Sequence, residues 1–174
     1  MRLVPSARKL VRVQWNVEGT IDVEAHAQIM EILDSVKDMT IATIRSDGFP
    51  HATVVAFVHD DLRLYFATAL ASQKARNIVM CNKISATITL PYARWGDIEG
   101  LSLGGYASEV TNQGELRAAQ TLLTARFPET VDVAPEMIGE IGLFRVDPVV
   151  ISLIDYTKGF GHTELIEIEK KLSA

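Results

Sequence analysis

Apolar residues recur with a helical period in two segments of the chain. In residues 22–37 they fall at positions i, i+3, i+4 and i+7, which places them on one face of a helix, and the leading Asp22 is a residue type that caps helix N-termini. Residues 115–127 carry a second such stripe, and residues 72–80 read as a third, shorter helix. The apolar positions of the first helix are Ile29, Ile32, Leu33 and Val36, and those of the second are Leu116, Ala119, Leu122, Leu123 and Phe127.

Elsewhere apolar and polar residues alternate, or β-branched residues cluster, and both patterns predict strands. Asp47-Gly48 lies between the first two of these segments and is typical of a β-hairpin turn. Since short turns also join the second to the third, we expect an antiparallel meander there. Gly104-Gly105 predicts a bulge or a close backbone approach, and Asp147-Pro148 a bend in the last strand. The six predicted strands cover residues 39–45, 51–59, 62–67, 84–90, 101–110 and 142–156.

Six strands with short connections and peripheral helices indicate an α+β barrel, and 174 residues suffice for one domain. The formal net charge of −5 argues against a nucleic-acid partner. No segment reaches the roughly 20 apolar residues of a membrane span, and Lys9 and Arg12 interrupt any secretory signal. Because Cys81 is the only cysteine, a reducing compartment is favoured. We therefore expect a cytoplasmic protein with neither nucleic-acid nor membrane partners.

The start of the short helix, Ser72-Gln-Lys-Ala-Arg-Asn77, is the best local candidate for binding chemistry. A helix N-terminus exposes backbone N–H groups and the positive end of the helix dipole, and both attract anions. Ser72 can cap this helix, while Lys74 and Arg76 add positive charge. A capped surface helix with two solvated cations would show the same pattern. The segment by itself therefore leaves a phosphate site and a plain surface helix both open.

Several short segments of the predicted barrel occur in a distinctive order and spacing. They are Thr40-Ile-Ala-Thr-Ile-Arg45, Asp47-Gly-Phe-Pro-His-Ala-Thr-Val54, Leu64-Tyr-Phe-Ala-Thr68, Ser72 with Lys74-Ala-Arg-Asn-Ile78, and Leu101-Ser-Leu-Gly-Gly-Tyr-Ala107. In these segments the chain resembles the flavin mononucleotide (FMN)-binding split-barrel family that includes pyridoxamine 5′-phosphate oxidase. The resemblance implies a six-stranded antiparallel split β-barrel of Greek-key type with peripheral helices. It places an N-terminal arm at residues 1–20, the FMN-binding domain at 21–158 and a C-terminal arm at 159–174.

The resemblance also implies a site and a partner. Ser72 and Lys74 would hold the flavin phosphate, with Arg76 as a helper. Trp95 would either stack on the flavin ring or lie at the interface of a homodimer, since in this family a second chain completes the site. The small-molecule substrate stays unknown, and no catalytic residue is assigned. The residues implied to line the ribityl chain and the ring are His51, Ala52, Thr53, Val54, Ala67 and Thr68.

Three positions depart from the pattern of the true oxidases. Thr53, Val58 and Gln73 stand where those enzymes carry cations, and their C-terminal arginine signature is absent from this chain. A site that holds one phosphate on FMN and a second on the substrate depends on such cations. The departures therefore argue against oxidation of vitamin B6, even with FMN bound.

The C-terminal segment carries a second candidate group. Gly159 and Gly161 flank Phe160, which predicts a tight backbone that exposes an aromatic ring, and His162 follows as a donor, a base or a ligand. This segment resembles the Gly-Phe-Gly loop of haem-utilisation proteins with the same barrel, in which case His162 would be a proximal haem ligand. The alternative is an arm that packs Phe160 on a partner subunit while His162 is merely hydrogen-bonded.

Three functions follow from these patterns. The first is an FMN-dependent oxidoreductase, in which FMN carries the redox chemistry and the protein shapes the site. The second is a haem-binding or haem-degrading protein on the same barrel. The third is a non-enzymatic flavin-binding, stress-associated module. The four histidines show no spacing that is typical of a zinc site, so no metal site is predicted.

Overall fold

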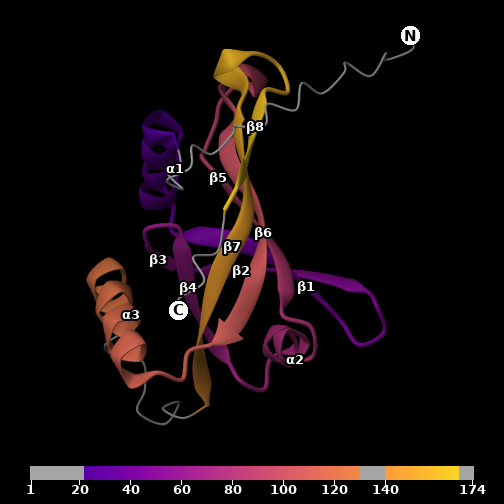
Figure 1. Cartoon of the computed structure of the whole chain (residues 1–174), viewed down its shortest axis with the longest axis vertical. Coiled ribbons are helices and arrows are strands. Elements are labelled where there is room, and N and C mark those ends of the chain that lie inside the picture. The colour runs from indigo at the N-terminus through magenta and orange to yellow at the C-terminus, as the bar shows by residue number, and fades with distance from the viewer. Residues whose placement is uncertain (1–21, 130–139, 169–174) are drawn as a thin grey trace.

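The computed structural model describes residues 22–129 and 140–168. In these residues three α-helices flank one curled antiparallel sheet of eight strands, an α+β half-barrel (Figure 1). The N-terminal arm predicted at residues 1–20 lies outside the described residues. The helices are α1 (Val23–Ser35), α2 (Gln73–Met80) and α3 (Gln113–Arg126). The strands are β1 (Asp38–Ile44), β2 (Pro50–Ala56), β3 (Val58–Asp60), β4 (Arg63–Ala69), β5 (Lys83–Thr89), β6 (Glu99–Glu109), β7 (Ile141–Asp155) and β8 (Thr163–Glu167).

Each α-helix begins at a residue whose side chain caps it. Asp22 accepts a hydrogen bond from the Glu24 N–H and Ser72 accepts one from the Ala75 N–H, so both predicted caps are confirmed. Asn112 caps α3 in the same way. These side-chain oxygens satisfy backbone donors that the first turn of a helix leaves free.

The main hydrophobic core joins buried residues of α1 and α2 to buried residues of the sheet. Three of the four predicted apolar positions of α1 are fully buried in it. The rings of Phe66 on β4 and Phe144 on β7 stack there with their centroids 5.5 Å apart. A smaller cluster lies beneath α3, where the predicted inward residues Ala119 and Phe127 are buried. The helical periods therefore identified the correct faces of both helices.

The prediction of six strands is wrong, because the sheet has eight. The segment 51–59 breaks at Phe57, whose ring is completely buried and whose N–H donates to the Lys37 carbonyl at 3.1 Å, so the segment forms both β2 and β3. The second extra strand, β8, lies in the predicted C-terminal arm and pairs with the second half of β7. An alternating pattern cannot show where a buried residue turns the chain between two strands.

The predicted three-stranded meander is also wrong in part. The β1–β2 hairpin forms around Asp47-Gly48, as expected. The second predicted hairpin forms only between β3 and β4, because the sheet order is β2-β1-β5-β6-β7-β4-β3: β4 lies between β3 and β7 and stands far from β2 in that order. Although β2 and β4 are not paired, they contact each other, because the sheet curls until its two sides meet.

The predicted bulge and bend coincide. Pairing between β6 and β7 changes register between Gly104 and Gly105, whose partners are Val150 and Pro148. Val149 is therefore the extra residue of a bulge in β7, without a partner in β6. A Cβ atom on Gly105 would lie 2.6 Å from the Asp147 carbonyl oxygen. The absence of a side chain at Gly105 is therefore what lets the two backbones approach here.

Candidate functional site

The two predicted phosphate-binding side chains, Ser72 and Lys74, converge with Thr68, which was predicted to line the ribityl chain and ring, where β4 leads into α2. The Lys74 ammonium donates to the Thr68 hydroxyl at 3.2 Å, and that hydroxyl lies 3.3 Å from the hydroxyl of Ser72. Ser72 is at the same time the N-cap of α2. We call Thr68, Ser72 and Lys74 the cradle. It combines one positive charge, two hydroxyl groups and the positive end of a helix dipole, which is the donor set that a phosphate requires.

Arg76 does not join the cradle. Its guanidinium donates to the Ala71 carbonyl and, at 3.2 Å, to the side-chain oxygen of Gln73, and the side chain is exposed. Residues i and i+2 point to opposite sides of a helix, so Lys74 and Arg76 cannot face the same group from their own helix positions. The predicted helper role of Arg76 gains no support from this arrangement.

The segment His51 to Val54 is divided between the two faces of β2. His51 and Thr53 are half-buried, whereas Ala52 is exposed and Val54 is 67% exposed. The His51 Nδ1 and Thr53 Oγ1 atoms are buried without a hydrogen-bond partner. Such a buried, unpaired polar atom costs about 1–3 kcal/mol, which favours a ligand that supplies the missing partners. Ala67 on β4 is exposed, next to the half-buried Thr68 of the cradle.

A buried hydrogen-bonded chain, which the sequence patterns did not reveal, joins the cradle helix to β2. Gln73 donates to the Asn77 side-chain oxygen at 2.8 Å, and the Asn77 amide donates to the Thr43 hydroxyl at 2.9 Å. Thr43 in turn donates to the His51 carbonyl at 3.3 Å. Asn77 and Thr43 are 1% and 0% exposed. The sequence could have indicated this chain of hydrogen bonds only through Asn77, a polar residue next to Ile78 on the apolar face of its helix.

Trp95 and His162 lie at the other end of the sheet. Trp95 begins a 3₁₀ turn, η1 (Trp95–Asp97), and is 71% exposed. This turn contacts a second 3₁₀ turn, η4 (Tyr156–Lys158), which leads into the turn that carries His162. In Figure 1 the β7–β8 turn is at the top and α2 is in the lower half. Within one chain, the structure thus separates these two residues from the cradle.

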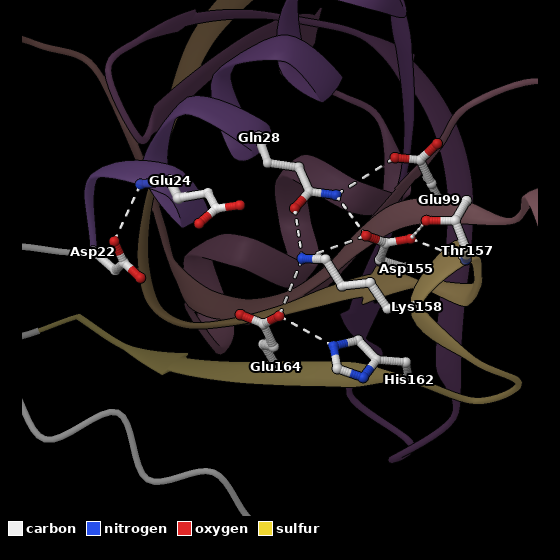
Figure 2. A network of polar contacts seen from close by, with 9 residues as sticks. All are labelled: Asp22, Glu24, Gln28, Glu99, Asp155, Thr157, Lys158, His162 and Glu164. Atoms are coloured by element: carbon white, nitrogen blue, oxygen red, sulfur yellow. Dashed lines mark hydrogen bonds and ion pairs between the residues drawn. The ribbon is translucent and has the colours of Figure 1, made fainter.

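A polar network holds the β7–β8 end together (Figure 2). The buried carboxylate of Asp155 accepts hydrogen bonds from the Thr157 N–H at 3.0 Å and from the Gln28 amide of α1 at 3.1 Å. The Lys158 ammonium lies 3.4 Å from Asp155 and 3.3 Å from Glu164. Burial raises the pKa of Asp155, but the hydrogen bonds from Thr157 and Gln28 and the charge of Lys158 outweigh it and hold the pKa at about 2.

His162 is anchored to this network by Glu164. Its Nε2 atom lies 3.0 Å from the Glu164 carboxylate, and this contact is the main cause that lowers the pKa of Glu164. The preceding turn uses positive φ angles of 132° at Gly159 and 77° at Gly161. Phe160 is 82% exposed, so the predicted tight backbone with an exposed ring is confirmed.

Within residues 22–129 and 140–168, no group of three or more His, Cys, Asp or Glu side chains could hold a metal ion. In the same residues, every helix is too short or too polar to cross a bilayer.

A curled antiparallel half-barrel sheet flanked by three α-helices is the architecture of a split-barrel protein. Residues 25–155 match the sequence profile of pyridoxamine 5′-phosphate oxidase, and this match covers most of the chain. The chain therefore belongs to the pyridoxamine 5′-phosphate oxidase family, and the suspected family is confirmed. No curated protein matches the chain.

Several solved structures share the fold. A haem-binding protein from Mycobacterium smegmatis superposes with a TM-score of 0.72 at 17% identity, over 85% of this chain and 60% of its own. HutZ, the haem storage protein of Vibrio cholerae, superposes at 0.62 with 21% identity, over 71% of this chain and 89% of its own. A putative pyridoxamine 5′-phosphate oxidase from Listeria innocua gives 0.61 at 19% identity, over 75% and 98%. The chain thus spans only 60% of the length of the mycobacterial protein, and identities this low establish the fold alone.

Proposed function

We propose that the chain is an FMN-binding flavoprotein whose cofactor phosphate is held by the cradle. The convergence of Thr68, Ser72 and Lys74 at the N-terminus of α2 is the observation that carries the proposal. Within the part of the chain that the structure describes, the two hydroxyls and the ammonium bond to one another and to the first turn of α2. A phosphate would replace these contacts with charge-assisted hydrogen bonds, which are stronger.

The unpaired atoms of β2 support a bound organic group beyond the phosphate. His51 Nδ1 and Thr53 Oγ1 would pair with polar atoms of the ribityl chain or the ring. FMN, when bound, supplies the transfer of electrons or hydride. The residues of this chain bind the cofactor and exclude water, and the reaction we propose is an oxidation or reduction of a substrate not yet identified.

We further propose a cytoplasmic homodimer in which the second copy completes the site. Val54 and Trp95 are large apolar residues with 67% and 71% of their surface exposed. Ala52 and Ala67 lie exposed beside the half-buried site residues of β2 and β4. A partner subunit over Ala52, Val54 and Ala67 would exclude water from the open side of the flavin ring. Of the predicted C-terminal arm, β8 pairs with β7 of the same chain, so we propose only the preceding turn, where Phe160 has 82% of its surface exposed, as a contact with the partner.

Haem binding is the second candidate function. Two of the similar structures are described as haem-binding and haem storage proteins, and the turn before β8 exposes Phe160 next to His162. To ligate iron through Nε2, His162 would first have to release Glu164, which lies 3.0 Å away. We rank FMN first, because ligation of iron through Nε2 would break this contact, whereas FMN binding at the cradle breaks no contact of His162.

The absorption spectrum of the purified protein, and the compound that it releases on denaturation, distinguish between FMN and haem. Flavin bands near about 370 and 450 nm with released FMN would support the proposal, and a strong band near about 400 nm would favour haem. Reduction of bound FMN by NADH or NADPH, followed by reoxidation, would separate an oxidoreductase from a flavin-binding module without turnover. A colourless protein that also fails to bind added FMN would overturn the proposal.

The cradle itself is tested by Lys74→Ala. A hydrogen bond to a charged group contributes about 1.5–3 kcal/mol, so the dissociation constant for FMN should rise about ten- to hundredfold. Arg76→Ala should have a smaller effect, because its guanidinium is bound to Ala71 and Gln73. Lys83→Ala on β5 removes an exposed lysine outside the cradle and serves as the matched control. Equal FMN affinity in the wild type and in Lys74→Ala would exclude this phosphate site.

A further inference from the structure

We infer that Thr43 and Asn77 are positioning residues of the flavin site: their hydrogen bonds fix the cradle helix relative to the inner face of β2. The inference rests on the proposed function, because it assigns a role in cofactor binding to two residues that would not touch the cofactor. It goes beyond that function by naming what holds the two halves of the site in register.

In the series of hydrogen bonds from Gln73 to His51, the donor and the acceptor of each bond are fixed. Gln73 donates to Asn77 Oδ1, so the Asn77 Nδ2 group must point to Thr43, to which it donates at 2.9 Å. A threonine hydroxyl has a single proton, and here it goes to the His51 carbonyl at 3.3 Å. Each of these three hydrogen bonds thereby has one direction, and a shift of α2 relative to β1 would break the series.

The two ends of the chain coincide with the two halves of the proposed site. Gln73 lies between Ser72 and Lys74, the two cradle residues of α2. His51 is the residue of β2 whose carbonyl ends the chain and whose Nδ1 is buried and unpaired. The distance between a phosphate in the cradle and a group at His51 is therefore set through Asn77 and Thr43. Loss of either residue should loosen the fit of a ligand that spans both.

Stability alone is a weak reason for this polar pair. Replacing both partners of a buried hydrogen bond by apolar groups of the same shape can be nearly neutral for folding. An apolar pair of the same shape could pack α2 against β1 at little cost in stability, but it would not fix the direction of approach. Hydrogen bonds depend strongly on angle, whereas apolar contacts do not. A buried Asn and Thr in this place thus fit a demand for precise placement.

Thr43→Val tests the inference with the least change of shape. It removes the donor to His51 and leaves the Asn77 amide unpaired, and we expect the dissociation constant for FMN to rise about five- to tenfold. Thr43→Ser keeps the hydroxyl and should remain within twofold of the wild type. Thr87→Val is the same substitution at an exposed position of β5 that takes no part in these hydrogen bonds, and it should leave the affinity for FMN unchanged. Affinity is measured by quenching of flavin fluorescence on the full chain, below the melting temperature of each apo variant.

A second readout separates positioning from mere stability. Visible circular dichroism of the bound flavin reports its orientation, and at saturating FMN we expect a changed spectrum for Thr43→Val and a wild-type spectrum for Thr43→Ser. If Thr43→Val does not fold, Gln73→Met decides the question, because it removes the first donor from the half-buried start of the chain. We expect at least a twofold weaker affinity for that variant.

The outcomes distinguish the inference from the proposed function. If the wild type binds FMN and Lys74→Ala weakens it, while Thr43→Val and Gln73→Met bind with wild-type affinity and spectrum, the positioning role is refuted and the cradle stands. If the wild type does not bind FMN, both proposals fail. A lower melting temperature of apo Thr43→Val with unchanged affinity would likewise assign Thr43 a structural role only.

Discussion

Asp155 offers the sharpest test of the network at the β7–β8 end. Its carboxylate is 3% exposed and accepts hydrogen bonds from Thr157 and Gln28, with Lys158 beside it. These contacts hold its pKa at about 2, against an ordinary value of 3.8. One pKa unit corresponds to 1.36 kcal/mol, so the ionised carboxylate contributes roughly 2 kcal/mol to the free energy of unfolding.

The pH dependence has a defined sign. A carboxyl group whose pKa is lower in the folded state stabilises the fold above its unfolded pKa, and this contribution disappears as the pH falls through the folded value. For Asp155 it is complete above about pH 5 and shrinks as the pH drops through 3.8 toward about 2. Asp155→Asn should therefore cost roughly 2 kcal/mol or more at pH 7, where its amide group faces the donors of Gln28 and Lys158, and progressively less near pH 2.

Urea unfolding followed by far-ultraviolet circular dichroism measures this difference between pH 7 and pH 2.5. The protein concentration is held constant, because the stability of an oligomer depends on it. Asp60→Asn is the matched control, since Asp60 is exposed at the end of β3, and its effect should be small at every pH. A difference between the wild type and Asp155→Asn that stays constant over the whole pH range would refute the assigned cause of stability.

Two further predictions concern the bulge and the C-terminal turn. Gly105→Ala should lower the free energy of unfolding by about 1–3 kcal/mol, because its Cβ atom would lie 2.6 Å from the backbone oxygen of Asp147. Gly96→Ala is the control, since its Cβ atom would meet no atom within 4 Å and the change should be tolerated. Thermal unfolding compares the two variants, and equal melting temperatures would contradict the close approach. His162→Ala tests the haem candidate: haem bound through this residue gives a Soret band that the variant shifts or loses. An unchanged band and affinity would remove His162 from iron ligation.

The sequence was sufficient wherever the information was local. The period of α1 identified its buried face, and Asp22 and Ser72 cap their helices as predicted. Gly104-Gly105 marks the bulge because the constraint involves the missing side chain itself. Spacing within one helix also distinguishes Lys74 from Arg76, since residues two apart point in different directions. That argument was available from the sequence alone.

Pairing between distant segments could not be predicted in this way. Besides its sequence neighbour β3, β4 pairs with β7, which lies far away in the sequence, and no periodicity encodes that choice. Phe57 looks like one more apolar residue in a strand, but its complete burial turns the chain from β2 into β3. The contact between Asn77 and Thr43 likewise depends on how α2 packs against β1. Such contacts are consequences of the assembled sheet.

The central position of β7 in the sheet has a consequence for the order of folding. This strand pairs with β6 along its length, with β4 through its first half and with β8 through its second. On the ribosome, a nascent chain that has released only the segments up to α3 therefore carries two strand edges, those of β4 and β6, that still await their common neighbour. Unpaired edges invite association with other chains, and pairing between distant segments is slow. The interval before β7 emerges is thus the stage of synthesis at which this protein is most prone to associate with other chains.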